Sequence, residues 1–134
     1  TTQPPPRVTE AGLIKELEAR GIGRPSTYAA IIETIVRREY VWKKGTALVP
    51  TFTAFAVVDL LAGYLGWLVD YQFTAKMEDD LDEISNGKAR RVDYLQHFFL
   101  GNGTPGLRDR VSGIEGDIDP RKICSIPLGP NEAG

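Results

Sequence analysis

Apolar residues recur at helical spacing in several segments of the chain. In residues 9–20, Leu13, Ile14 and Leu17 form one stripe, Thr9 is placed to cap the helix, and Gly21 ends it. A second helix follows with the clearest amphipathic pattern in the sequence, in which the apolar positions i, i+3, i+4, i+7 and i+8 are Tyr28, Ile31, Ile32, Ile35 and Val36.

Strand-forming residues on both sides of a short connection predict a β-hairpin after these helices. Tyr40, Val41 and Trp42 precede a Lys-Lys-Gly-Thr turn, and the run "ALV" follows it. Two helices, a tight turn between them and a hairpin form the layout of a winged helix-turn-helix, which is a frequent nucleic-acid-binding platform.

Three further helices are expected, with a loop-rich tail after them. The first spans residues 51–64 with Thr51 as its cap, the next opens at Phe73-Thr74 and ends at Asn86-Gly87, and the last spans about 89–99. Their apolar stripes are Phe55, Val58 and Leu61, then Met77, Leu81 and Ile84, then Val92, Leu95 and Phe99. The expected fold class is mainly α, with winged helix-turn-helix-like helices and one small β-hairpin, followed by further helices and an irregular tail. We expect a linker at 1–8, a helical domain at 9–103 and a tail rich in Gly, Asp and Pro at 104–134.

Length and composition narrow the class of protein. A chain of 134 residues with 42% apolar residues has the size of one domain and can bury a core. No apolar run approaches the ~18 residues of a membrane span, and nothing resembles a signal peptide, so a cytoplasmic location without membrane contact is expected. Cys124 is the single cysteine, which excludes an internal disulfide and a cysteine-based zinc site.

Charge is distributed unevenly along the chain. Residues 1–50 hold eight basic and five acidic residues, whereas residues 51–134 hold eight basic and thirteen acidic residues. An acidic domain is a poor candidate for wrapping duplex DNA unaided, because non-specific affinity comes mainly from phosphate neutralisation. The excess of basic residues in the first fifty positions still allows a local basic face there.

The segment "RGIGRPSTYAAII", residues 20–32, gathers phosphate-binding features at the start of the second helix. The first turn of a helix leaves backbone N–H groups unpaired, Pro25 suits the first helical position, and either Arg24 or Ser26 would be the cap. Gly23, with Gly21, allows close approach of a ligand, and the hydroxyls of Ser26 and Thr27 lie near the free N–H groups. Arg24 adds a permanently charged fork suited to phosphate oxygens.

A purely structural interpretation of the same segment is a tight turn followed by a capped helix. The segment lacks the Lys before Ser/Thr of the Walker pattern, and it follows a helix rather than a strand.

Other residues are weaker candidates for a binding, metal or catalytic role. Trp42, Lys43 and Lys44 in the hairpin are candidates for base stacking and phosphate contact. The acids of "MEDDLDEI" spread around an exposed helix face and mainly favour the helix dipole, so no metal site is expected. His97 has no apparent partner for catalysis and Trp67 is expected in the core.

Several of these segments together resemble a known family. The run "TEAGLIKELEARGIGRPSTYAAIIETIVRREYV", followed by "KKG", "LVPT", "LVDYQFTAKMEDDLDEISNG" and "FF", is similar to the core of bacterial type IA DNA topoisomerases over residues 4–103. The actinobacterial branch looks nearest, and "IDPRKICSI" resembles the start of its C-terminal repeat region.

The resemblance implies an enzyme that cuts one DNA strand through a tyrosine, passes another strand through the gap and reseals it, relaxing negative supercoils. This chain would be a fragment that lines the single-strand groove, in which Arg24 and Thr27 match residues that contact DNA phosphates and Arg38 matches a further DNA-contacting arginine. The family often has Gly where this chain has Glu39, and a carboxylate there could compete with phosphate for Arg38.

The resemblance also implies what this segment lacks. The family's catalytic tyrosine sits in a Met-Arg-Thr-Asp or similar context, which none of Tyr28, Tyr40, Tyr64, Tyr71 and Tyr94 shares. The acidic domain that binds Mg²⁺ in the full enzyme lies outside this sequence, so the fragment is expected to be inactive alone, without a cofactor, and monomeric. Its expected partners are single-stranded DNA, through the phosphate backbone, and the remaining domains of the parent enzyme. The alternatives are a stand-alone winged-helix regulator that binds duplex DNA and a protein-interaction module.

Overall fold

The computed structural model describes residues 5–125 and confirms a mainly helical fold with one small hairpin. In this part of the chain the order of elements is α1 (Glu10–Ala19), α2 (Tyr28–Arg37), β1 (Val41–Lys44), β2 (Ala47–Pro50), α3 (Phe52–Tyr64), the 3₁₀ helix η1 (Gly66–Val69), α4 (Tyr71–Ser85), α5 (Arg91–Leu100), α6 (Leu107–Ile114) and α7 (Pro120–Ile123). The start of the predicted linker, residues 1–4, and the end of the predicted tail, residues 126–134, lie outside the described residues.

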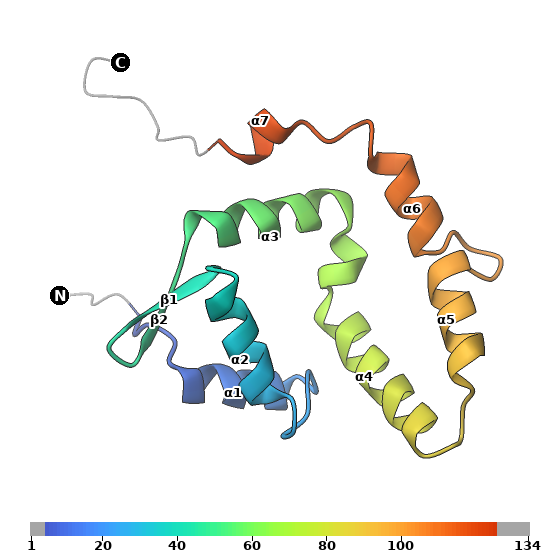
Figure 1. Ribbon diagram of the computed structural model, residues 1–134, viewed down its shortest axis with the longest axis horizontal. Helices are drawn as coiled ribbons and strands as arrows, with labels where there is room; N and C mark the ends of the chain where they lie inside the picture. Colours follow the sequence, from blue (N-terminus) through green and yellow to red (C-terminus); the bar gives the residue numbers. More distant parts are fainter. Residues whose placement is uncertain (1–4, 126–134) are drawn as a thin grey trace.

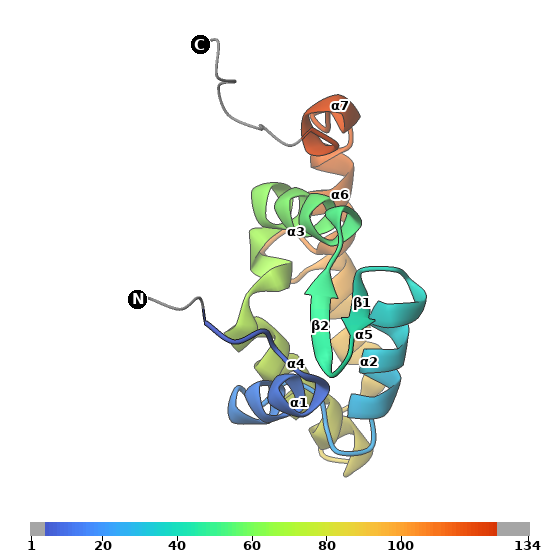
Figure 2. The ribbon, with the colours of Figure 1, turned by 90° about the vertical axis from the view of Figure 1, so that its left-hand side faces the viewer.

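The first two helices and the hairpin form one module (Figures 1 and 2). β1 and β2 pair antiparallel with Lys44 opposite Ala47, so the turn contains two residues. The predicted Lys-Lys-Gly-Thr turn is therefore wrong for the two lysines, which belong to β1. Gly45 has φ +62, the positive value that the first position of a type II′ hairpin turn requires. The segment before α1 joins the hairpin, since the N–H of Leu48 donates to the carbonyl of Val8 at 2.8 Å.

A small apolar core lies inside this module. Tyr28 and Ile32 of α2 and Leu48 of β2 are the buried hydrophobic residues of the described chain. Tyr28 and Ile32 both belong to the stripe that the sequence predicted, so the face of α2 that packs inward is confirmed.

Three helices end with the same backbone arrangement, in which the two residues after the C-cap donate back to the last turn. α1 ends in this way at Gly21, α4 at Gly87 and α2 at Glu39. In α2 the N–H of Glu39 donates to Val36 and the N–H of Tyr40 to Ile35, both at 2.9 Å. The residue after the C-cap takes a left-handed conformation, and Glu39 has φ +57, the one positive φ outside glycine among the described residues. A glycine at this position would adopt the same backbone conformation without steric strain.

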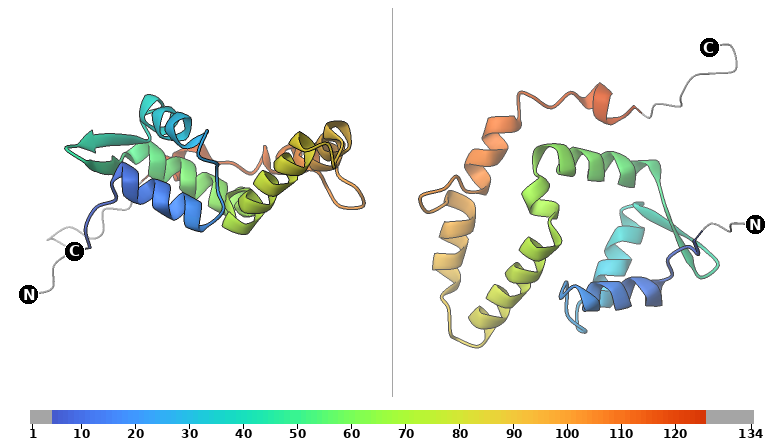
Figure 3. Two further views of the ribbon diagram at one scale, coloured as in Figure 1. Left: turned by 90° about the horizontal axis from the view of Figure 1, so that it is seen from below. Right: turned by 180° about the vertical axis from the view of Figure 1, so that it is seen from behind.

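The second half of the chain curves away from the module along α3, η1 and α4, and α5 returns beside α4 (Figures 1 and 3). Thr51 caps α3 as predicted, because its hydroxyl accepts the N–H of Ala54 at 3.3 Å. α4 begins at Tyr71, two residues earlier than predicted, because Asp70 accepts the N–H of Phe73 at 2.8 Å and is the cap.

Aromatic side chains join α4 and α5. Trp67 of η1 packs edge-on against Phe73 with ring centroids 4.9 Å apart, and Phe73 stacks with Phe98 at 6.3 Å. Trp67, which was expected in the core, is half-buried, and the guanidinium of Arg110 lies over its ring. The tail expected to be rich in loops contains α6 and α7.

One predicted apolar stripe and two residues of a second remain exposed among the described residues. Val92, Leu95 and Phe99 of α5 are 58%, 51% and 48% exposed, because Tyr94 and Phe98 are the half-buried aromatic residues of this helix. On α3, Phe55 and Val58 are likewise more than half exposed. The spacing predicted which residues share a face, whereas it did not predict that these faces stay uncovered.

Candidate nucleic-acid interface

The start of α2, with residues 21–27 before it, is the candidate phosphate site. The helix begins at Tyr28, later than either predicted cap, and Pro25, Ser26 and Thr27 form a turn ahead of it. This turn forms because the hydroxyl of Thr27 accepts the N–H of Arg24 at 2.9 Å and donates to the carbonyl of Arg24 at 3.0 Å. The predicted caps, Arg24 and Ser26, are therefore corrected: Thr27 occupies the N-cap position and its side chain bonds backward rather than into the helix.

Free backbone donors are present at this helix start. The N–H groups of Thr27 and Tyr28 both donate to the carbonyl of Arg24, and the N–H of Ile31 donates to the carbonyl of Thr27. Within the described residues, the N–H groups of Ser26, Ala29 and Ala30 have no protein acceptor. All three residues are exposed, so they can reach an anion from solvent.

Gly23 is buried and tied to α4. It has φ +74, and its N–H donates to Oε1 of Glu78 at 3.0 Å. A Cβ at this position would lie 2.9 Å from Cε1 of Tyr28, so the ring of Tyr28 occupies the space a side chain needs. Gly23 therefore shapes the loop, and its own N–H is already committed.

Arg24 lies between its own loop and α4. Its Nε donates to Asp82 at 3.0 Å, its Nη1 to the carbonyls of Gly21 and Gly23, and its Nη2 to Asp79 at 3.0 Å. Nη2 also lies 2.9 Å from Asp82. The hydrogen bond to Asp82 is the largest cause that raises the pKa of Arg24, which keeps the guanidinium charged.

The acids of α4 are the residues whose role the sequence prediction missed. Glu78, Asp79 and Asp82 were expected to spread around an exposed face and to favour the dipole, yet the first turn of α4 contains no acid. Positions i, i+1 and i+4 lie on one side of a helix, and here all three reach residues 23 and 24. Their spacing was the signal available in the sequence, whereas the partner lies 55 or more positions away.

The other candidate residues lie after the far end of α2. Arg38 is the C-cap of α2 and is exposed. Trp42 and Lys44 share one face of β1 because side chains alternate along a strand, and Trp42 is 49% exposed. Lys43 lies on the opposite face, where its Nζ pairs with Glu10 at 2.5 Å. The structure thus places Trp42 and Lys44 together and commits Lys43 to α1.

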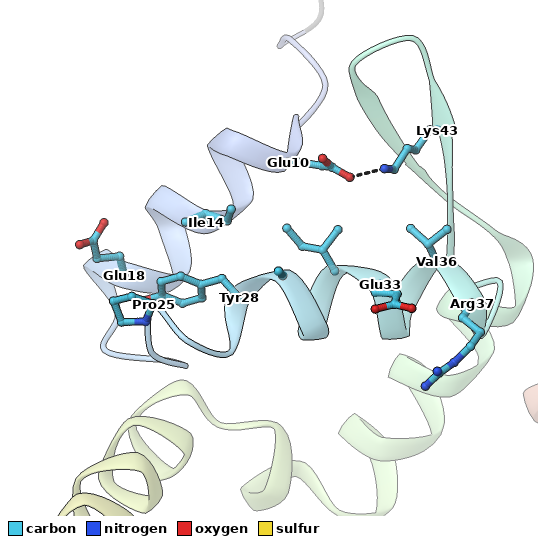
Figure 4. Close-up of a pocket in the computed structure, with 11 residues that line it drawn as sticks. Glu10, Ile14, Glu18, Pro25, Tyr28, Glu33, Val36, Arg37 and Lys43 are labelled. Atoms are coloured by element: carbon cyan, nitrogen blue, oxygen red, sulfur yellow. Dashed lines mark ion pairs between the residues drawn. The ribbon is translucent and has the colours of Figure 1, made fainter.

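A groove of about 850 Å³ runs between α1 and α2 (Figure 4). Its lining includes the acids Glu10, Glu18 and Glu33 and the bases Arg37 and Lys43. Figure 4 shows the Glu10–Lys43 ion pair bridging its upper end. Three carboxylates against two bases make this groove unfavourable for a phosphate, so the candidate interface is the helix start and not this groove.

Neither a metal site nor a membrane span emerges from residues 5–125. No group of three or more potential ligands in this range is placed to hold a metal ion. No helix in this range is long and apolar enough to cross a membrane. His97 lies on α5 beside the aromatic groups of Phe98 and Tyr94.

Comparison with known proteins gives consistent matches. The family model described as DNA topoisomerase matches residues 1–96. The protein named DNA topoisomerase 1 of Streptomyces coelicolor is 51% identical over 146 residues, which is 96% of this chain and 15% of the relative. The proteins of the same name from Mycobacterium tuberculosis and Synechocystis are 53% and 56% identical, each over 95% of this chain. These identities do not separate the actinobacterial relatives from the cyanobacterial one.

A solved structure is also similar. Full-length topoisomerase I from Thermotoga maritima matches with a TM-score of 0.62 and 46% identity, over 66% of this chain and 15% of that one. The chain therefore spans about 15% of the length of the relatives it matches.

Proposed function

From the premise that the chain belongs to the bacterial DNA topoisomerase family, we propose that it is the segment of a type IA enzyme that holds the backbone of single-stranded DNA. The parent enzyme would cleave one strand, pass another through the gap and reseal it, which relaxes negative supercoils in the cytoplasm. This segment binds DNA as a monomer and contributes neither the tyrosine nucleophile nor the Mg²⁺-binding acids.

The proposed contacts lie at the two ends of α2. At its start are Arg24, Ser26 and Thr27, and after its end are Arg38, Trp42 and Lys44. Gly23 shapes the loop with its N–H bound to Glu78, and Lys43 is paired with Glu10, so neither is assigned a phosphate. A ten-residue helix is about 15 Å long, so the two groups suit separate phosphates of one strand. Trp42 would stack on a base while Lys44, on the same face of β1, meets a phosphate.

The observation that carries the proposal is the set of free N–H groups at Ser26, Ala29 and Ala30. Exposed and unpaired donors at a helix start, on the positive end of the helix dipole, bind anions without side-chain rearrangement. The exposed hydroxyl of Ser26 lies beside them.

The test is the salt dependence of binding to a fluorescent oligothymidylate of about twelve nucleotides, a length within the site sizes of single-strand binders. Each phosphate contact contributes about −0.7 to the slope of log K against log salt. We expect Arg38→Ala to reduce the slope by about one such contact. Arg121→Ala on α7 removes an equal charge away from the site and is the control.

Three outcomes of this test oppose the proposal. Equal slopes for the Arg38→Ala and Arg121→Ala variants would remove Arg38 from the interface. Preference for a duplex of the same length would favour a winged-helix regulator. Absence of binding to either DNA at low salt would favour a protein-interaction module.

A further inference from the structure

Every nitrogen of the Arg24 guanidinium already faces a protein oxygen within 3.2 Å in this structure. Arginine has five side-chain N–H groups. Nε donates to Asp82, Nη1 to the two loop carbonyls of Gly21 and Gly23, and Nη2 to Asp79. Nη2 also forms an ion pair with Asp82 at 2.9 Å. A phosphate that binds Arg24 therefore competes with these acceptors.

The acceptors differ in how firmly they hold Arg24. Asp82 contacts two nitrogens, Nε at 3.0 Å and Nη2 at 2.9 Å, and its side chain is 53% exposed. Asp79 contacts Nη2 alone at 3.0 Å, and its side chain is 79% exposed. A single, highly solvated ion pair is the weaker one, because water competes for both charges. Asp79 is thus the acceptor whose displacement by an incoming anion costs the least interaction free energy.

The loop itself stays in place during such an exchange. The N–H of Gly23 is bound to Glu78 of α4, and Nη1 of Arg24 closes the loop on its own carbonyls. Neither contact involves Asp79. The exchange of one acceptor on Nη2 therefore requires no movement of α4 or of the helix start.

We infer that Asp82 is a positioning residue that holds the Arg24 guanidinium at the start of α2, and that Asp79 occupies the Nη2 donor which a DNA phosphate takes when it binds. The inference rests on the proposed function, since it needs a phosphate at this helix start. Two carboxylates three positions apart on one helix then have opposite effects on DNA affinity.

The experiment compares Asp79→Asn, Asp82→Asn and Glu83→Gln in the whole 134-residue chain, with the same oligothymidylate. Glu83 lies on α4 outside the contacts of Arg24, so Glu83→Gln measures the general effect of one lost charge. Relative to this control we expect Asp79→Asn to bind about two- to fivefold tighter and Asp82→Asn about fivefold weaker. In an Arg24→Gln background, all three substitutions are expected to have the same effect.

A second measurement needs no DNA. In the NMR spectrum of the free chain, the Nε–H signal of Arg24 is expected to persist in Asp79→Asn and to be lost by fast exchange in Asp82→Asn. Equal affinities of the two variants, or Nε–H signals that behave alike in both, overturn the inference. Failure of the wild-type chain to bind the oligonucleotide overturns the proposed function and with it the role of Asp79, whereas the Nε–H signals still decide the role of Asp82.

Discussion

Oδ2 of Asp82 lies within 3.0 Å of two nitrogens of Arg24, although the residues are 58 positions apart. This contact joins the loop before α2 to the C-terminal part of α4. Glu78 adds a hydrogen bond from the backbone of Gly23 one turn earlier on the same helix. The start of α2 is therefore built from two distant segments, and its shape depends on α4.

This dependence predicts a local change in hydrogen exchange. Replacing Glu78 by Ala removes the acceptor of the Gly23 N–H, so we expect that amide to exchange about five- to tenfold faster. Amide exchange followed by NMR provides the measurement. Glu83→Ala on the same helix is the control, and an unchanged rate at Gly23 in the Glu78 variant would show that the bond is not maintained in solution.

The left-handed conformation of Glu39 predicts a stabilising substitution. A non-glycine residue at φ +57 carries a steric cost that glycine does not. Glu39→Gly is expected to raise the free energy of unfolding by about 0.5–1 kcal/mol, because the greater freedom of glycine in the unfolded chain offsets part of the gain.

Urea denaturation of Glu39→Gly beside Glu39→Ala separates the backbone from the side chain. Alanine removes the carboxylate and keeps the strain, so its stability should stay within about 0.5 kcal/mol of the wild type. A stabilisation of the same size in both variants would assign the effect to the carboxylate.

Gly23 is expected to be the least replaceable glycine of the loop. Gly23→Ala combines a positive φ with a contact of 2.9 Å to Tyr28, and we expect a loss of about 3 kcal/mol in the free energy of unfolding. Gly45→Ala is the matched control, since Gly45 has a similar φ of +62 and nothing within 4 Å, and about 1 kcal/mol is expected there. Thermal unfolding by circular dichroism measures both, and equal losses would mean that Tyr28 moves aside without cost.

The two tryptophans are expected to respond differently to DNA. Trp42 is exposed on β1, whereas Trp67 packs against Phe73 and Arg110. Stacking of a base on Trp42 should quench its fluorescence, and Trp42→Phe should abolish the quenching on addition of oligothymidylate. Quenching that survives in Trp42→Phe would place the base elsewhere.

Local sequence patterns predicted much of the fold because helices and hairpins depend on near neighbours. The caps Thr9 and Thr51 bond to residues three positions ahead, and the stripe of α2 follows the helical period. The start of α4 was placed at Phe73-Thr74, two residues late, because the capping role of Asp70 was not recognised. The family was also evident from sequence, since its characteristic segments keep their order.

By itself the sequence determined the hairpin and the helices α1 to α5, the residues that share a face on these helices and the family to which the chain belongs, whereas it missed η1, α6 and α7. Only the tertiary structure decided the partners of Arg24, the left-handed backbone at Glu39 and which apolar faces stay exposed. The physical reason is the range of the interactions. Periodicity and capping act over about four residues, whereas the acids that bind Arg24 come into reach only when α4 packs against the loop before α2.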